Sequence, residues 1–254
     1  MLDSIIERLK QGRQTIAWPK QPPELPDRFR GRLIVDPELC LEGCEVCVKT
    51  CPVGALERPT AAAPRVDLGK CLFCADCAEA CPVGAIGHSR DWRLAARKRE
   101  HFILSPDEAL PLAEALDEQS RRLFGRSLKL REVSAGGCNA CEADTNVLGT
   151  IGYDLGRFGI QFVASPRHAD GILITGPVTK NMELALKKTY DAVPAPKIVI
   201  AVGACAISGG PFAGNEEIVG GADPVVPVDL YIPGCPPHPI TILDGLVRLL
   251  GRIQ

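Results

Sequence analysis

The stretch CLFCADCAEACP, residues 71–82, decides the fold of the N-terminal half of the chain. Its four cysteines are separated by two, two and three residues, and the last one precedes Pro82. Thiolates at this spacing suit a compact metal group held by a short loop, with the fourth cysteine carried away by the proline turn. The start MLDSIIERLK lacks the apolar core and cleavage site of a secretory signal. A reducing compartment keeps thiols free of disulfides, so the 12 cysteines predict metal ligation.

A second group, CLEGCEVCVKTCP at residues 40–52, repeats this pattern with one extra residue in the first gap, which Gly43 should absorb. Both groups continue as CPVGA, which indicates an internal duplication with a period of about thirty residues. Zinc motifs pair two CxxC units across a longer gap, so zinc is the weaker interpretation. No CxxC is followed by histidine, which excludes covalent haem on motif grounds.

The duplicated motif resembles the bacterial two-cluster 4Fe-4S ferredoxins, over roughly residues 33 to 90. In that family three cysteines of one group share a cluster with the fourth cysteine of the other group. The resemblance therefore implies two ligand sets. Cluster 1 would take Cys40, Cys44, Cys47 and Cys81, and cluster 2 would take Cys51, Cys71, Cys74 and Cys77.

The remaining four cysteines lie in a region with a different pattern. From Lys129 onward, the apolar runs IQFVASP, GILITGP, KIVIAVGAC and VDLYIPGC end in turns and alternate with helix-like segments such as NMELALKKTYDAV. Such runs predict a buried parallel sheet with helices on both faces, a doubly wound α/β fold. Ligands in these sheets bind beyond the carboxyl ends of the strands, where Cys205 and Cys235 are expected.

The segments GGCNACEAD, SPRHAD, GACAISGG and YIPGCPPHP resemble the small, B-type subunit shared by complex I and the membrane-bound nickel-iron hydrogenases, from about Leu130 to the C-terminus. The resemblance implies a flavodoxin-like domain and a third 4Fe-4S cluster facing the large subunit. Its ligands would be Cys138, Cys141, Cys205 and Cys235. Complex I subunits usually present two adjacent cysteines in the first motif, whereas the hydrogenase branch has CxxC, as in this chain. The spacing therefore favours the hydrogenase branch, of the formate hydrogenlyase type.

The N-terminal part fits the same assignment, because its helix, the FRG of residues 29–31 and the double motif resemble the I-type subunit of those complexes. The chain is thus interpreted as a fusion of two subunits. Four segments are expected: residues 1–32 as an amphipathic helix and extended arm, 33–90 as the two-cluster ferredoxin domain, 91–130 as a linker and docking helix, and 131–254 as the B-type domain. Ser105 is the expected N-cap of the docking helix.

The resemblance implies an electron-transfer subunit of a group 4 nickel-iron hydrogenase or complex-I-like oxidoreductase, relaying electrons through three 4Fe-4S clusters. Its partners would be a D-type large subunit with a nickel-iron or quinone site, other peripheral-arm and membrane subunits, and a donor or acceptor such as formate dehydrogenase or ferredoxin. It would lie peripherally on the cytoplasmic side of the inner membrane. The alternatives are a quinone-reducing or hydrogenase-related assembly without nickel, and a zinc-stapled structural protein.

Net charge, hydropathy and the absence of nucleotide-binding motifs exclude several other functions. The formal net charge is only −2, no apolar run reaches membrane-spanning length, and neither GxGxxG nor a P-loop is present. No nucleic-acid partner, nucleotide site or catalytic residue is therefore predicted. The N-terminal helix is expected to dock either on an anionic membrane or on protein. Arg167 and His168 are expected either by the cluster-binding face or as ordinary surface residues. Glu142 is expected either to relay protons or to cap a helix. His238 has no predicted metal role.

Overall fold

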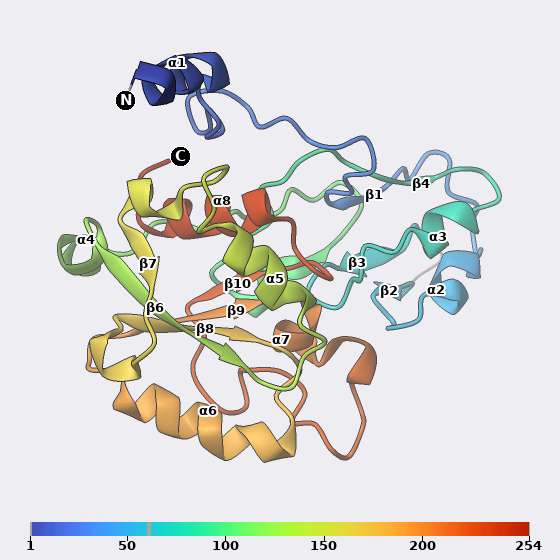
Figure 1. Cartoon of the computed structure of the whole chain (residues 1–254). Coiled ribbons are helices and arrows are strands. Elements are labelled where there is room, and N and C mark those ends of the chain that lie inside the picture. The colour runs from blue at the N-terminus through green and yellow to red at the C-terminus, as the bar shows by residue number, and fades with distance from the viewer. Residues whose placement is uncertain (1, 60–61, 254) are drawn as a thin grey trace.

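The C-terminal half of the chain is built on a five-stranded, fully parallel sheet (Figure 1). The structure is a computed structural model and describes residues 2–59 and 62–253. The strands are β6 (Leu128–Ser134), β7 (Ile160–Phe162), β8 (Gly171–Thr175), β9 (Ile198–Val202) and β10 (Leu230–Ile232). Their order, β10-β9-β8-β6-β7, is the flavodoxin-like order with a switch point between β6 and β8. The predicted doubly wound sheet is confirmed.

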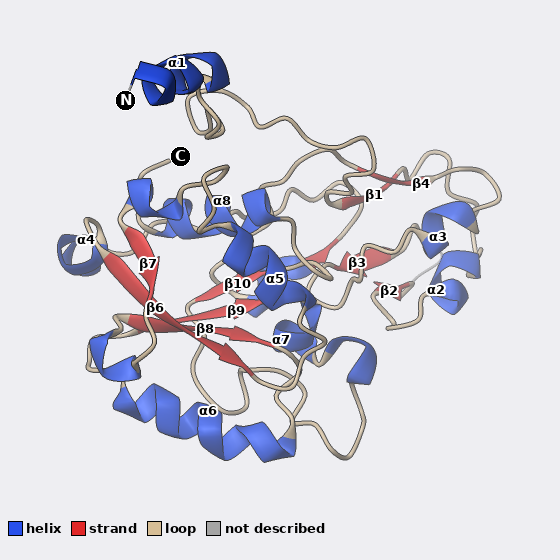
Figure 2. Ribbon diagram, viewed as in Figure 1, coloured by secondary structure: helices blue, strands red, loops and turns tan. Residues whose placement is uncertain are grey.

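Helices cover both faces of this sheet (Figure 2). They are α5 (Ala140–Val147), α6 (Lys180–Ala192), α7 (Ala204–Ser208) and α8 (Pro239–Leu249), with short 3-10 turns η2 (Leu155–Phe158), η3 (Pro166–His168) and η4 (Gly210–Phe212). Ile200 of β9 packs with α8, while its neighbours Val199 and Ala201 pack with residues of α6 and α7. A strand buried on both faces is apolar at almost every position, which explains the continuous apolar runs.

The cysteine-dense half consists of short elements around two small antiparallel sheets. These elements are β1 (Leu33–Val35), α2 (Val46–Thr50), β2 (Leu56–Glu57), β3 (Arg65–Asp67), α3 (Asp76–Glu79), β4 (Ile86–His88), η1 (Arg99–Phe102) and β5 (Ile103–Leu104). Strand β1 pairs with β4, and the second sheet has the order β2-β3-β5. Gly43 adopts φ +69° with open space around it, so it absorbs the extra residue of the first cysteine group as predicted.

The N-terminal helix and the arm that follows it differ in their contacts with the rest of the chain. Helix α1 (Leu2–Gln11) lies within the predicted N-terminal segment and leaves Ile5 and Leu9 exposed. The arm is fixed to the sheet half by Trp18, whose ring meets that of Phe158 edge to face at 5.7 Å. Within residues 2–59 and 62–253, no helix is long and apolar enough to cross a bilayer.

The prediction of a helix that begins at Ser105 is wrong for most of that segment. Residues 105–117 run as irregular backbone, and α4 covers only Glu118–Phe124, capped by the Asp117 side chain. The backbone N–H of Ala113 donates to Ala95 at 2.7 Å, and the N–H of Leu116 donates to Leu249 at 2.9 Å. Since these N–H groups are bonded to distant carbonyls, they are not available for a helical ladder.

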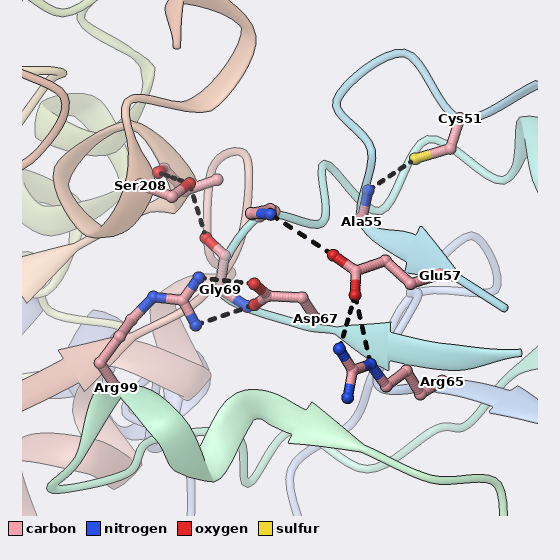
Figure 3. A network of polar contacts seen from close by, with 10 residues as sticks. Cys51, Ala55, Glu57, Arg65, Asp67, Gly69, Arg99 and Ser208 are labelled. Atoms are coloured by element: carbon pink, nitrogen blue, oxygen red, sulfur yellow. Dashed lines mark hydrogen bonds and ion pairs between the residues drawn. The ribbon is translucent and has the colours of Figure 1, made fainter. Parts of the chain in front are cut away.

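A polar staple lies where the two halves meet (Figure 3) and consists of the ion pair Asp67–Arg99, within the cysteine-dense half, and the Ser208–Gly69 hydrogen bond, which joins that half to the sheet half. Arg99 donates to both carboxylate oxygens of Asp67 at 2.8 and 2.7 Å. The Ser208 hydroxyl in α7 donates to the Gly69 carbonyl at 3.1 Å. Around this staple one hydrophobic cluster continues from the cysteine-dense half into the sheet, where Phe102 meets Tyr231 edge to face at 6.3 Å. The halves therefore share one core.

Replacing Arg99 by Met should destabilise the chain by about 3 kcal/mol, because the buried Asp67 carboxylate loses its cation. The measurement is the free energy of unfolding of the full chain from urea titration. Arg93→Met is the matched control, since Arg93 pairs with Asp91 at 2.8 Å but both side chains are well exposed. That variant should lose about 1 kcal/mol or less. Equal losses in the two variants would contradict the staple.

Candidate metal centres

Eight cysteines of the N-terminal half line two separate pockets, four in each. The first pocket is lined by Cys40, Cys44, Cys47 and Cys81, and the second pocket by Cys51, Cys71, Cys74 and Cys77. Each pocket thus takes three cysteines from one group and the last cysteine of the other. Four thiolates are the usual donor set of a 4Fe-4S cluster, so the residues present fit that group.

The repeated CPVGA turns carry the exchanged cysteine into each pocket. The N–H of Ala55 donates to the Cys51 sulfur at 3.2 Å, and the N–H of Ala85 donates to the Cys81 sulfur at 3.3 Å (Figure 3 shows the first). Burial raises the pKa of Cys81, but the N–H groups of residues 83–86 outweigh burial and leave that pKa lowered. The turn is therefore suited to holding a thiolate.

Burial is the main cause of the raised pKa values of two buried thiols in the second pocket. It raises the pKa of Cys71 to about 12 and that of Cys77 to about 11, and nearby thiols add to both shifts. These side chains are neutral at pH 7 unless a metal replaces the proton. Metal binding at these thiols therefore has to release protons, as ligating thiolates require.

The last four cysteines gather at the carboxyl edge of the parallel sheet. Cys138 and Cys141 follow β6, Cys205 lies in α7 after β9, and Cys235 follows β10. Burial, and after it the charge of Cys205, raises the pKa of Cys141, with Cys235 and Cys138 also contributing. The four thiols therefore lie close enough to influence one another. Cys138 and Cys235 are exposed, so this third site opens on the surface.

The third site adjoins the second pocket. Burial raises the pKa of Cys235, and the charges of Cys138 and Cys74 add to the shift, although Cys74 belongs to the second pocket. One surface cavity is lined both by Leu72 and Phe73, which flank that pocket, and by Cys235. Gly69, the acceptor in the polar staple, lies two residues before Cys71 of the second pocket. The staple therefore fixes how the second and third sites face each other.

Glu142, next to Cys141, has a structural contact that neither predicted role described. Its buried carboxylate accepts hydrogen bonds from Ser134 at 2.6 Å and Thr175 at 2.7 Å, so it ties α5 to the ends of β6 and β8. Burial, and then the charge of Glu142, raises the pKa of Glu132 to about 7. The two carboxylates form an acidic pair behind the third site.

Arg167 and His168 are exposed and do not lie beside the cysteines, so of their two predicted places the one by the cluster-binding face is wrong and the surface alternative is confirmed. They lie in η3, in the connection that returns from β7 to the amino end of β8, and share a surface pocket with residues 194–196 before β9. The cysteines follow the carboxyl ends of the strands, at the opposite edge.

His238 caps α8 by accepting from the Ile240 N–H at 3.2 Å, which gives it a structural role.

Comparison with known proteins identifies both halves. Residues 138–249 match the family described as NADH ubiquinone oxidoreductase, 20 Kd subunit, and residues 32–82 match a 4Fe-4S dicluster domain. The probable membrane-bound hydrogenase subunit mbhJ of Pyrococcus furiosus is 42% identical over 132 residues, which are 52% of this chain and 79% of that protein. The chain belongs to the 20 kDa subunit family.

Two further proteins are similar to part of this chain. The B-type subunit of the NADH-quinone oxidoreductase of Heliobacterium modesticaldum is 44% identical over 119 residues, 46% of this chain and 68% of that protein. A chain in the structure of the membrane-bound sulfane sulfur reductase, an archaeal respiratory membrane complex, is 35% identical, with a TM-score of 0.47, and the match covers 54% of this chain and 75% of that chain. The predicted resemblance of the C-terminal half to B-type subunits is confirmed by the family match, and the dicluster match confirms the N-terminal ferredoxin-like half.

Sequence reasoning missed the glycines that make room for the third site. A Cβ on Gly203, which has φ +91°, would lie 2.5 Å from the Cys141 sulfur, and a Cβ on Gly210 would lie 2.8 Å from the Cys205 sulfur. Both glycines were visible in the sequence near Cys205, but only the fold shows which sulfur each one meets.

Gly203→Ala should displace Cys141 and lower the iron content of the anaerobically purified chain by about four atoms, the content of one cubane. The measurement is iron per chain. Gly214→Ala is the matched control, because Gly214 has a similar φ of +84° but nothing within 4 Å of the added Cβ. The control should keep its iron despite similar backbone strain. An equal loss in both variants would mean that strain, and not the contact with Cys141, removes the metal.

Proposed function

We propose that this chain is the electron-transfer subunit of a membrane-associated group 4 nickel-iron hydrogenase or complex-I-like oxidoreductase, carrying three 4Fe-4S clusters. The observation that carries the proposal is the division of the 12 cysteines into three groups of four, two lining separate pockets and one at the sheet edge. Bound clusters would supply one-electron chemistry, with potentials set by hydrogen bonds to sulfur, burial and nearby charge.

The proposed ligand sets follow these groups. The first pocket would hold cluster 1, the second pocket cluster 2, and the third site, formed by Cys138, Cys141, Cys205 and Cys235, cluster 3. The chain's own residues supply the thiolates, the N–H groups at the CPVGA turns and the fixed contact between the second and third sites. The segment boundaries 1–32, 33–90, 91–130 and 131–254 are part of the same proposal.

The exposed third site indicates where a partner would bind. Cys138 and Cys235 are exposed, although thiolates that hold a cluster are usually shielded from solvent. A large subunit of the D type, with a nickel-iron or quinone site, would cover this edge of the sheet. Other peripheral-arm and membrane subunits, and a donor or acceptor such as formate dehydrogenase or ferredoxin, complete the proposed assembly. It would lie peripherally on the cytoplasmic side of the inner membrane.

The spacing of the first motif supports the hydrogenase interpretation over its closest alternative. The chain has CxxC at Cys138 and Cys141, and the relative in Pyrococcus furiosus is described as a probable membrane-bound hydrogenase subunit. The alternative is a complex-I-like or hydrogenase-related assembly without nickel, which the similarity to the B-type subunits of quinone oxidoreductases supports. The two differ in the metal of the partner and not in the ligands of this chain.

A zinc-stapled structural protein fits the geometry less well. A zinc ion needs four thiolates at about 2.3 Å from one point. Across residues 2–59 and 62–253, no three His, Cys, Asp or Glu side chains converge closely enough to hold a single ion. Thiolates that bind separate corners of a cubane lie farther apart than the four ligands of one ion.

The test is the metal content of the intact complex, purified anaerobically through a tag on this chain. We expect nickel together with at least about twelve iron atoms per chain, the iron of three cubanes. Iron without nickel would replace the hydrogenase interpretation by the nickel-free alternative. Zinc without iron would overturn the redox function.

A further inference from the structure

Arg58 contacts a thiol of the first pocket directly. Its Nη2 donates to the Cys40 sulfur at 3.1 Å, and its Nη1 donates to the Ala62 carbonyl at 2.7 Å. The side chain is half-buried and lines the pocket together with all four cysteines of the first set.

The second pocket has a different residue at the equivalent position. CPVGALER ends on Arg58 and CPVGAIGH ends on His88, so the two side chains occupy the same place in the internal repeat. His88 lines the second pocket, as Arg58 lines the first. The repeat is otherwise well matched here, since the N–H bonds to Cys51 and Cys81 have nearly the same length. The duplication thus places a guanidinium at one pocket and an imidazole at the other.

The charges at the two positions also differ. An arginine is always protonated in proteins. Burial, and then the charge of Arg30, lowers the pKa of His88, which keeps that ring neutral at pH 7. Arg30 itself is exposed and donates to the Phe73 carbonyl at 3.2 Å, not to a sulfur. The acidic Glu45 near Arg58 is exposed and paired with Lys49 at 2.9 Å.

We propose that Arg58 makes the two ferredoxin-type sites unequal, by raising the reduction potential of the cluster in the first pocket above that of the cluster in the second. Reduction adds one negative charge to a cluster and its thiolates. A cation that donates an N–H···S bond stabilises the reduced form more than the oxidised form, which raises the potential. The inference rests on the proposed cluster ligation, and it makes the site farther from the sheet edge the stronger electron acceptor of the pair.

The test is a redox titration of the anaerobically purified full chain at pH 8, with dithionite as the source of each electron and EPR as the readout. Cys44→Ser and Cys74→Ser assign the signals to the two pockets. Arg58→Gln should lower the ratio of reduced to oxidised cluster in the first pocket about tenfold at a given potential, the loss of one charge-assisted hydrogen bond. For a one-electron couple this is a shift of about 59 mV. The second pocket should not shift.

Two further substitutions separate charge from structure. Arg58→Lys keeps the cation and should retain most of the potential, whereas Arg58→His gives both repeats the same residue and should bring the two potentials together. Arg65→Gln is the matched control, because Arg65 lies in the same half but pairs with Glu57 at 2.8 Å, and it should shift neither potential.

The outcomes distinguish this inference from the proposed function. Unchanged potential in Arg58→Gln and Arg58→His, with both clusters present, would overturn the role of Arg58 alone. Loss of first-pocket iron from all three Arg58 variants would also overturn it, since Arg58 would then hold the Cys40 loop and not tune a potential. Absence of every cluster from the unmodified chain would instead refute the proposed function.

Discussion

The contact between Ser208 and Gly69, beside the Asp67–Arg99 ion pair, is the constraint on which the arrangement of the second and third sites depends. Gly69 lies two residues before Cys71 of the second pocket, and Ser208 lies three residues after Cys205 of the third site. A Cβ on Gly69 would lie 2.7 Å from the Arg99 guanidinium and 3.0 Å from the Ile207 side chain, so the contact leaves no room for a side chain at position 69. Electron transfer between two sites needs such a fixed approach.

The internal repeat explains the geometry of the N-terminal half and its asymmetry. Two copies of one loop exchange their last cysteine, so neither pocket can form unless both copies fold. This exchange ties the repeats together without a large core, which suits a half made of very short helices and strands. The copies have since diverged where the exchanged turns end, at Arg58 and His88, and charge now distinguishes pockets that are alike in their thiols.

Much of the fold and of the candidate site could be predicted from local sequence pattern. Apolar runs predicted β8 and β9 because strands buried on both faces are apolar at almost every position. The resemblance to two-cluster ferredoxins grouped eight cysteines into the same two sets of four that line the two pockets. The backbone of residues 105–117 could not be predicted, because the N–H groups of Ala113 and Leu116 bond to Ala95 and Leu249, far away in the sequence. The edge occupied by Arg167 depends on where the β7 to β8 connection turns back, which no local pattern encodes. Gly203 acquires its role only when β9 brings it to Cys141.

The central claim is that one chain holds three separate one-electron centres on its 12 cysteines. The most direct measurement is a reductive titration of the anaerobically purified full chain, counting the electrons taken up per chain while the visible absorbance bleaches. The account predicts about three electrons per chain, one for each cubane. Uptake of about two electrons would contradict the third site, and a colourless chain that takes up none would contradict the account as a whole.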